Sequence, residues 1–250
     1  MKRAAPTGAI ADRPTAPKRP RPRPRPQPAL AAGVHLLAHQ ATLTYVPGAV
    51  PCARTEFDAL FDAQPPPTPN PMNAKTFLRR RQGTFGATYR FGRQTSVNMG
   101  PVDAAPDVVR RCVDDARRRA GPDHAPNYTG AHVNWYPDGA AGLKAHQDAT
   151  DPGPGAHLPI FSYSFLVDAA DKPAAQPCRD FVVSHDKAQR DVAARVETRH
   201  GDLVVMAGAQ FQRALWHAVP PTARKDKKHL RRVNVTVRPW AGSKAVRDAK

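Results

Sequence analysis

The feature that most limits the fold is a succession of short β-type segments in the second half of the chain. Each segment is rich in β-branched or aromatic residues, and loops rich in Gly, Pro and Asp separate it from the next. Short strands that follow helices indicate a sandwich or barrel with the helices packed outside. We expect strands at His132–Tyr136, Ile160–Val167, Arg179–Val183, Ala194–Glu197, Asp202–Met206 and Arg232–Val237.

The first half of the chain supplies a further strand and the two helices. Thr42–Val46 alternates and is rich in β-forming residues, and Pro47-Gly48 would stop it. Thr55–Asp62 carries large apolar residues at helical spacing, which predicts a short amphipathic helix. Pro106–Arg119 has apolar residues on one face and arginines on the other, so we expect a second helix there.

Composition excludes several classes of protein. No apolar run approaches the roughly 18 residues that a membrane span needs, although 40% of the 250 residues are hydrophobic. Met1-Lys2-Arg3 leads into prolines and arginines rather than into the apolar stretch of a secretory signal. Cys52, Cys112 and Cys178 form no C-x-x-C pattern, which argues against a disulfide framework and a zinc finger. We therefore expect an intracellular protein with no membrane partner.

The positive charge is concentrated at the two ends of the chain. The formal net charge is +17. Residues 1–30 hold eight prolines and eight basic residues against one acid, which predicts a disordered, extended arm. Arg224 to Lys250 holds ten Lys and Arg against two acids, and residues 241–250 form a basic tail. The arm is either a nucleic-acid-binding arm or a nuclear import signal, or else a solvated tail of biased composition.

His146-Gln147-Asp148 is the first pattern that carries chemistry. Residues i and i+2 of a strand point to the same side, so the imidazole and the carboxylate can converge on one point. The ten His and 21 acids would give about one such pattern by chance. His200-Gly201-Asp202 is a second occurrence, but its glycine and the apolar run after it are typical of a turn that enters a strand.

His217 lies in the apolar setting Leu215–Pro220 and could complete a metal site. Two His and one carboxylate with open positions form the facial triad of non-heme Fe(II) oxygenases. Taken by its local sequence alone, His217 is better explained as a core histidine with satisfied hydrogen bonds.

The segment Arg231–Arg238 alternates cationic or polar residues with valines. In a strand, Arg232, Asn234, Thr236 and Arg238 share one face. Guanidinium groups offer paired donors to a carboxylate, so this face suits a carboxylate pocket. An edge strand with a charged outer face would give the same pattern.

Taken together, the ordered motifs resemble the AlkB family of 2-oxoglutarate/Fe(II) dioxygenases, and most of all its eukaryotic DNA-repair branch. The resemblance covers residues 41–240. The motifs in chain order are Thr44–Gly48, Arg80–Gly86, Thr88-Tyr89-Arg90-Phe91, Asn134–Gly139, His146-Gln147-Asp148, Pro159–Ser164, Arg179-Asp180-Phe181, Gly201–Met206, Trp216-His217 and the R-x-N-x-T-x-R at 232–238.

The resemblance implies an α+β, mainly β fold, in which a double-stranded β-helix (jelly-roll) is backed by helices and preceded by the basic arm. It implies that His146, Asp148 and His217 hold Fe(II). It also implies that Arg232 pairs with the distal carboxylate of 2-oxoglutarate, helped by Tyr136, and that Asn134, Asn234 and Arg238 line the same pocket and its iron-proximal end. We expect a monomer.

The reaction that the resemblance implies is oxidative decarboxylation of 2-oxoglutarate by O2, coupled to hydroxylation of an N-methyl group that leaves as formaldehyde. The implied substrate is an alkylated base in DNA or RNA, and Tyr89 and Phe91 match the aromatic pair that stacks on an extruded base. The alternative is that both form one face of a core strand. Ala149 and Thr150 stand where the repair enzymes carry acidic residues, Gln94–Pro101 does not match a base-displacing finger, and Asp168–Pro177 is longer than expected.

Two other functions remain compatible with the sequence. The same chemistry could act on methylated RNA or on a protein side chain. A basic jelly-roll that binds nucleic acid without turnover is a function of another class, against which the complete triad and the arginine pair argue.

Overall fold

The computed structural model describes residues 28–70, 73–86, 90–91, 94–148, 158–168, 178–222 and 230–239. The predicted arm therefore lies outside the described residues except at its last three positions, and the tail at 241–250 lies wholly outside them. Within the described part of the chain, no helix is both long and apolar enough to cross a membrane.

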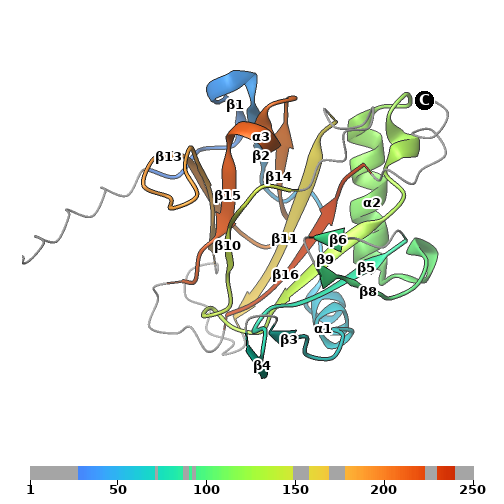
Figure 1. Ribbon diagram of the computed structural model, residues 1–250. Coiled ribbons are helices and arrows are strands. Elements are labelled where there is room, and N and C mark those ends of the chain that lie inside the picture. Colours follow the sequence, from blue (N-terminus) through green and yellow to red (C-terminus); the bar gives the residue numbers. More distant parts are fainter. Residues whose placement is uncertain are drawn as a thin grey trace, which may run out of the picture.

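Two facing sheets form the body of the molecule, as the jelly-roll prediction requires (Figure 1). The major sheet has the strand order β1 (Gly33–Leu36), β2 (Thr42–Val46), β14 (Asp202–Ala207), β11 (Ile160–Asp168), β16 (Leu230–Val237), β9 (Ala131–Tyr136), β5 (Arg81–Phe85), β8 (Val97–Asn98). The minor sheet has the order β10 (Leu143–His146), β15 (Trp216–Val219), β12 (Arg179–Ser184), β13 (Val192–Thr198). Neighbouring strands within both sheets pair antiparallel, except for β5 and β8, which are parallel.

Short elements complete the described chain. Two ribbons pair β3 (Pro69–Asn70) with β4 (Asn73–Phe77) and β6 (Arg90–Phe91) with β7 (Gln94–Thr95). The helices are α1 (Arg54–Asp62), α2 (Asp107–Ala120), α3 (Phe211–Ala214) and the 3-10 turns η1 (Ala38–Gln40), η2 (Val102–Ala104) and η3 (Ala125–Asn127).

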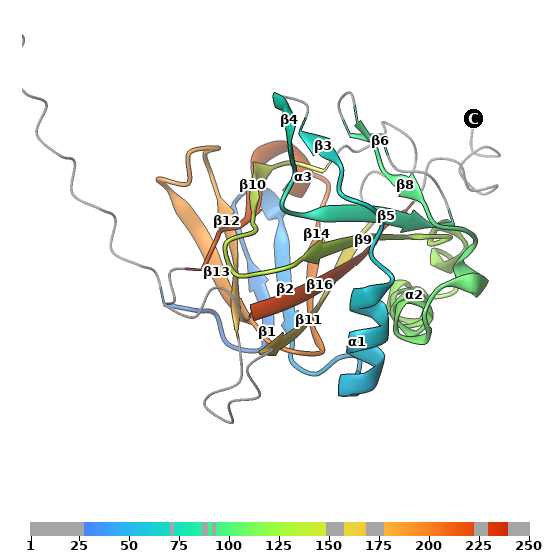
Figure 2. The same ribbon diagram turned by 90° about the horizontal axis from the view of Figure 1, so that it is seen from below.

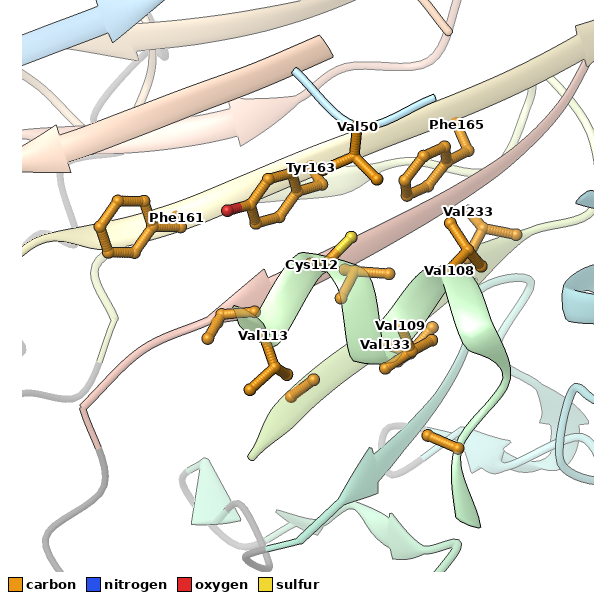
Figure 3. Close-up of a cluster of buried hydrophobic side chains, with 14 of the residues drawn as sticks. Val50, Val108, Val109, Cys112, Val113, Val133, Phe161, Tyr163, Phe165 and Val233 are labelled. Atoms are coloured by element: carbon orange, nitrogen blue, oxygen red, sulfur yellow. The ribbon is translucent and has the colours of Figure 1, made fainter. Parts of the chain in front are cut away.

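Helices α1 and α2 lie on the face of the major sheet that points away from the minor sheet (Figure 2). Figure 3 shows the apolar contact that holds α2 against the sheet. Val108, Val109, Cys112 and Val113 of α2 face aromatic and valine side chains of the sheet. Two hydrogen bonds fix the contact, from the Trp135 indole to the Leu60 carbonyl at 2.8 Å and from the Tyr163 hydroxyl to Asp115 at 2.9 Å.

The alternation of the central strands determines which residues enter the space between the sheets. On β16, Val233, Val235 and Val237 belong to the helix-side core, so Arg232 and Asn234 face the minor sheet. On β9, Val133 and Trp135 likewise pack toward the helices, whereas the residues between them point inward. A second apolar core, built from both sheets, fills the interior around Phe181, Val183 and Tyr136.

Strand β16 is central rather than peripheral, which rules out the edge-strand interpretation of Arg231–Arg238. It pairs with β11 on one side and with β9 on the other, and Arg232 lies opposite Leu166 and Tyr136. Its polar face is therefore buried against the other sheet instead of shielding an edge from solvent.

Candidate metal centre

Three side chains that are distant in the chain converge at one end of the minor sheet. His146 is the last residue of β10, and its register partner on the neighbouring strand β15 is His217. Asp148 follows two residues after His146. The potential ligand atoms of the three residues all lie within 4.8 Å of one another. The strand register thus brings together the two imidazoles and the carboxylate that the sequence predicted.

The carboxylate lies between the two imidazoles. Asp148 Oδ1 is 3.6 Å from His146 Nε2, and Asp148 Oδ2 is 3.8 Å from His217 Nε2. These separations exceed those of direct hydrogen bonds, so the three groups surround a point without closing on one another. Two nitrogens and one carboxylate oxygen suit Fe(II) and leave further positions open.

Neighbouring groups fix the orientation of two of these residues. The Nδ1 atom of His146 lies 3.0 Å from the Lys144 carbonyl, and as donor in this bond it leaves Nε2 with its lone pair directed at the centre. The backbone N–H of Asp148 donates to Gln212 Oε1 at 2.8 Å. Gln212 comes from the short helix α3, and the local sequence gave no sign of this contact.

Burial keeps the second imidazole neutral. His217 stacks on Phe181, with ring centroids 5.7 Å apart, and also contacts Phe211. Burial, followed by the neighbouring His146, lowers the pKa of His217 to about 3. The imidazole is therefore neutral near pH 7 and has one ring nitrogen free of a proton, as a metal ligand must. The alternative of a core histidine fails on its hydrogen bonds, because His217 Nδ1 is buried and has no partner among the described residues.

The charge of the Asp148 carboxylate is retained in spite of burial. Burial alone would raise the pKa of Asp148, but His217, His146 and Arg238 outweigh it and hold the pKa well below its usual range. Arg238 Nη1 lies 3.9 Å from Asp148 Oδ1. Of the predicted pocket residues, Arg238 is thus the one beside the metal centre itself.

Arg232 and Tyr136 form a second part of the site. Arg232 is 1% exposed, and its Cζ lies 4.7 Å from the centroid of the Tyr136 ring. Arg232 Nη2 donates to Ser164 Oγ at 2.9 Å, while Nε and Nη1 have no partner in the part of the chain that the structure describes. The buried Tyr136 hydroxyl likewise has no hydrogen-bond partner among the described residues. These buried hydrogen-bond donors, two on the guanidinium and one beside it, suit an anionic group such as a carboxylate.

The two predicted asparagines differ in how they are held. Asn234 donates to Ser162 Oγ at 2.9 Å and to the Tyr163 carbonyl at 2.7 Å, and Thr236 donates to its Oδ1 at 3.0 Å. Its donors are therefore committed to the protein, and Asn234 positions its neighbours rather than offering a free amide.

Among the described residues, the hydrogen bonds to the Asn134 side chain go to its carbonyl oxygen. Arg80 and His132 both donate to Asn134 Oδ1, the latter at 3.2 Å. This leaves the Asn134 amide group for a ligand. His132 is a site residue that sequence reasoning missed, although its place two residues before Asn134 on β9 gives it the same inward face. Burial, followed by Arg80, lowers its pKa to about 3.

The predicted substrate residues lie at the limit of the described chain. Tyr89 is outside the described residues, and so are Ala149, Thr150 and most of the long 168–177 segment. Phe91 belongs to strand β6 of the β6–β7 ribbon, where only the backbone is described. The roles of Tyr89 and Phe91 in substrate binding therefore stay predictions.

The second His-x-Asp pattern has the structural role predicted for it. Asp202 accepts hydrogen bonds from the Tyr45 hydroxyl at 2.7 Å, the Gly48 amide at 2.9 Å and the Arg199 amide at 2.6 Å. Gly201 has φ +83°, and a Cβ atom there would lie 2.8 Å from the Val50 carbonyl oxygen. Three of the roughly four acceptor sites of this carboxylate are thus committed to closing a turn, which gives Asp202 a structural role.

A family model described as the 2OG-Fe(II) oxygenase superfamily matches residues 59–238. The comparison with curated proteins gave no match.

Three of the similar solved structures illustrate the likeness in fold. The structure of OsALKBH1 is 16% identical, with 83% of this chain and 100% of that chain covered and a TM-score of 0.48. Full-length Neurospora crassa T7H in complex with alpha-KG is 9% identical over 79% and 75% of the two chains, with a TM-score of 0.44. The Fe(II)/(alpha)ketoglutarate-dependent dioxygenase TqaL is 11% identical over 82% and 86%, with a TM-score of 0.41.

The family assignment rests on the family model, since the identities to these structures are 16% or lower. The matched segment spans most of the chain and contains all three residues of the candidate metal centre. The chain belongs to the 2OG-Fe(II) oxygenase superfamily, a family of oxidoreductases that use Fe(II), 2-oxoglutarate and O2.

Proposed function

We propose that this oxygenase removes methyl groups oxidatively from N-alkylated bases in nucleic acid, with His146, Asp148 and His217 as its iron ligands. The observation that carries the proposal is the convergence of these three ligand atoms within 4.8 Å, together with a buried guanidinium on the inward face of β16 whose donors have no partner among the described residues. Two neutral imidazoles and a carboxylate fit Fe(II), and the residues around them fit a dicarboxylate.

The residues on the inward faces of β9 and β16 would hold the cosubstrate. Arg232 binds the distal carboxylate of 2-oxoglutarate, and the Tyr136 hydroxyl donates to the same group. Asn134 offers its amide to the cosubstrate, because Arg80 and His132 occupy its carbonyl oxygen. Arg238 balances the charge of Asp148, while Asn234 holds Ser162 and the β11 backbone in place.

Bound Fe(II) and 2-oxoglutarate supply the oxidation of the methyl group by O2, with succinate, CO2 and formaldehyde as products. The chain contributes position and a dry environment. Phe181 and Phe211 shield His217 from water, and Lys144 sets the proton of His146 on Nδ1. The low pKa of His217 means that no proton has to leave it when the metal binds near neutral pH.

Nucleic acid is the substrate that the charge and the motif order support best. A net charge of +17 favours binding to phosphate backbones and makes that binding sensitive to salt. Tyr89 and Phe91 would stack on the extruded base, as the AlkB-like pattern implies. In this proposal, residues 41–240 form an AlkB-like dioxygenase domain, and the basic arm at residues 1–30 binds nucleic acid.

The direct test is mass spectrometry of methylated substrates incubated with the full-length protein, Fe(II), 2-oxoglutarate and ascorbate. The panel contains N-methylated DNA oligonucleotides, RNA oligonucleotides and peptides, and Asp148→Ala is the matched control. Loss of a methyl group from an oligonucleotide with the wild type alone supports the proposal. Demethylation or hydroxylation confined to the peptides would contradict it and support a protein side chain as substrate.

The non-catalytic alternative has its own signature. A binding protein without turnover would retain oligonucleotide affinity in His146→Ala while the wild type forms no succinate under any condition. The proposed oxygenase forms succinate in the wild type and loses it in His146→Ala.

A further inference from the structure

Two buried guanidinium groups, not one, meet at the Tyr136 ring. The Cζ atom of Arg179 lies 5.8 Å from the centroid of this ring, and the Cζ atom of Arg232 lies 4.7 Å from the same centroid. Both arginines are 1% exposed. Arg179 opens β12 of the minor sheet, whereas Arg232 lies on β16 of the major sheet. One cation therefore enters the interior from each sheet.

The protein satisfies only part of the Arg179 guanidinium. Its Nε donates to the Pro220 carbonyl at 3.1 Å and its Nη2 donates to the Ala141 carbonyl. Its Nη1 is buried and has no partner among the residues that the structure describes. The two hydrogen bonds to backbone carbonyls fix the guanidinium plane and leave Nη1 as a donor for a ligand.

No carboxylate of the described chain neutralises this pair of arginines. Asp180 is 3.0 Å from Arg195 on the neighbouring strand, and Asp138 forms its ion pair with Arg79 at 3.7 Å. Burial, followed by the charge of Arg232, lowers the pKa of Arg179 to about 10. Arg179 therefore stays protonated at neutral pH, and two like charges share a dry interior. An arrangement of this kind is costly unless an anion joins it.

The unpartnered donors around Tyr136 match one carboxylate. They are Arg232 Nε, Arg232 Nη1, Arg179 Nη1 and the Tyr136 hydroxyl. An ionised carboxylate accepts at about four lone-pair sites on its two oxygens. A single carboxylate could thus satisfy donors that the protein leaves unsatisfied.

Strand β12 connects this position with the candidate metal centre. Arg179, Phe181 and Val183 are two residues apart along β12, Phe181 and Val183 belong to the core between the sheets, and Arg179 contacts Tyr136 of that core, so the three share the inward face. Val183 is the register partner of His217, and the Phe181 ring stacks on the His217 ring. The inward row of β12 therefore connects the residues that contact a candidate metal ligand, His217, with Arg179.

We propose that Arg179 is a second guanidinium for the distal carboxylate of 2-oxoglutarate, which it binds together with Arg232 and Tyr136. The inference rests on the proposed function, because it assigns a further residue to the same cosubstrate pocket. Arg179 is thereby a specificity residue, since it favours 2-oxo acids that carry a second carboxylate over those that lack one.

Calorimetric titration of the full-length protein, loaded with Mn(II) in place of Fe(II), tests the proposal without turnover. The probes are 2-oxoglutarate, which has the distal carboxylate, and pyruvate, a 2-oxo acid that lacks it. Arg179→Met removes the cation and keeps an apolar side chain, and Arg179→Lys keeps the charge without the planar donors. Arg195→Met is the matched control, because Arg195 pairs with Asp180 and Glu197 outside this pocket.

The proposal predicts that Arg179→Met weakens 2-oxoglutarate binding at least about tenfold, the usual effect of a hydrogen bond to a charged group, and leaves pyruvate binding unchanged. Arg179→Lys should restore part of the affinity, and Arg195→Met should bind 2-oxoglutarate as the wild type does. If Arg179→Met lowers the melting temperature but binds 2-oxoglutarate within about twofold of the wild type, Arg179 only clamps the loops at Ala141 and Pro220, and the proposal is wrong.

The two proposals can fail separately. Absence of 2-oxoglutarate binding in the wild type would overturn the proposed cosubstrate pocket and this inference with it. Normal binding by the wild type with an unaffected Arg179→Met variant would overturn this inference alone. Should Arg179→Met not fold, Arg179→Lys with the same two probes decides, and equal affinity of that variant for 2-oxoglutarate relative to the wild type counts against the proposal.

Discussion

His146 and His217 are direct partners across the β10–β15 ladder, and their ring centroids lie 4.2 Å apart. This relationship makes the metal centre a product of strand register rather than of a flexible loop. Asp148 follows two residues later, and its backbone N–H is held by Gln212. A site built in this way keeps its geometry when one ligand is removed, because each ligand is positioned by different contacts.

Asp148→Ala should abolish turnover and leave the fold intact. The carboxylate makes no contact shorter than 3.6 Å to either imidazole, but its loss leaves Arg238 without this partner, so the metal-free protein should lose about 1–3 kcal/mol of stability and still fold. Succinate formation and Tm of the metal-free protein are the two measurements. Asp148→Asn is the isosteric control, and a large loss of Tm in both variants would mean that Asp148 supports the fold.

Asp202→Ala should show the opposite behaviour. Its carboxylate accepts three hydrogen bonds that close the turn before β14, so we expect a loss of about 3 kcal/mol in unfolding free energy. Binding of Mn(II), measured at a temperature where the variant is folded, should be unchanged. Loss of the metal in Asp202→Ala would contradict the assignment of the two His-x-Asp patterns.

Tyr136→Phe should weaken 2-oxoglutarate binding about fivefold, which corresponds to one net hydrogen bond. The hydroxyl has no partner among the described residues, so the unfolding free energy of the ligand-free protein should stay within about 1 kcal/mol of the wild type.

Tyr128→Phe is the matched control for this variant. The Tyr128 hydroxyl donates to the Pro159 carbonyl at 2.8 Å in the helix-side core. Its removal should lower stability by about 1 kcal/mol and leave the affinity for 2-oxoglutarate unchanged. If both tyrosine variants changed only stability, Tyr136 would have no part in cosubstrate binding.

His132→Leu should raise the KM for 2-oxoglutarate and leave kcat nearly unchanged. His132 helps to orient the Asn134 amide by donating to its oxygen, and leucine of similar size offers no donor. Steady-state succinate formation separates the two constants. His132→Gln restores a donor and should recover much of the affinity, whereas equal KM values for wild type and His132→Leu would remove His132 from the site.

Local periodicity was sufficient to predict the parts of the site that lie on single strands. The i, i+2 spacing placed Arg232 and Asn234 on one face of β16, and the valines between them are buried against the helices as expected. The predicted strand at 42–46 has the observed bounds, and α2 begins and ends one residue after its predicted bounds. Both predictions depend on residues that are close together in the sequence.

The contacts that sequence reasoning missed all depend on tertiary pairing. Gln212 reaches Asp148 from a short helix 64 residues away, and Arg80 reaches Asn134 across 54 residues. Arg179 was recognised as part of a motif, but its meeting with Arg232 required the two sheets to face each other. Alternation specifies the face of a strand and not the element opposite that face.

Anaerobic titration of the purified protein with Fe(II) and then 2-oxoglutarate tests the central claim most directly. The account predicts a weak visible charge-transfer band when 2-oxoglutarate is added to the Fe(II)-loaded wild type, and no band with His146→Ala, Asp148→Ala or His217→Ala. A wild type that gives no band, or an alanine variant that keeps it, would show that these three residues do not hold the iron.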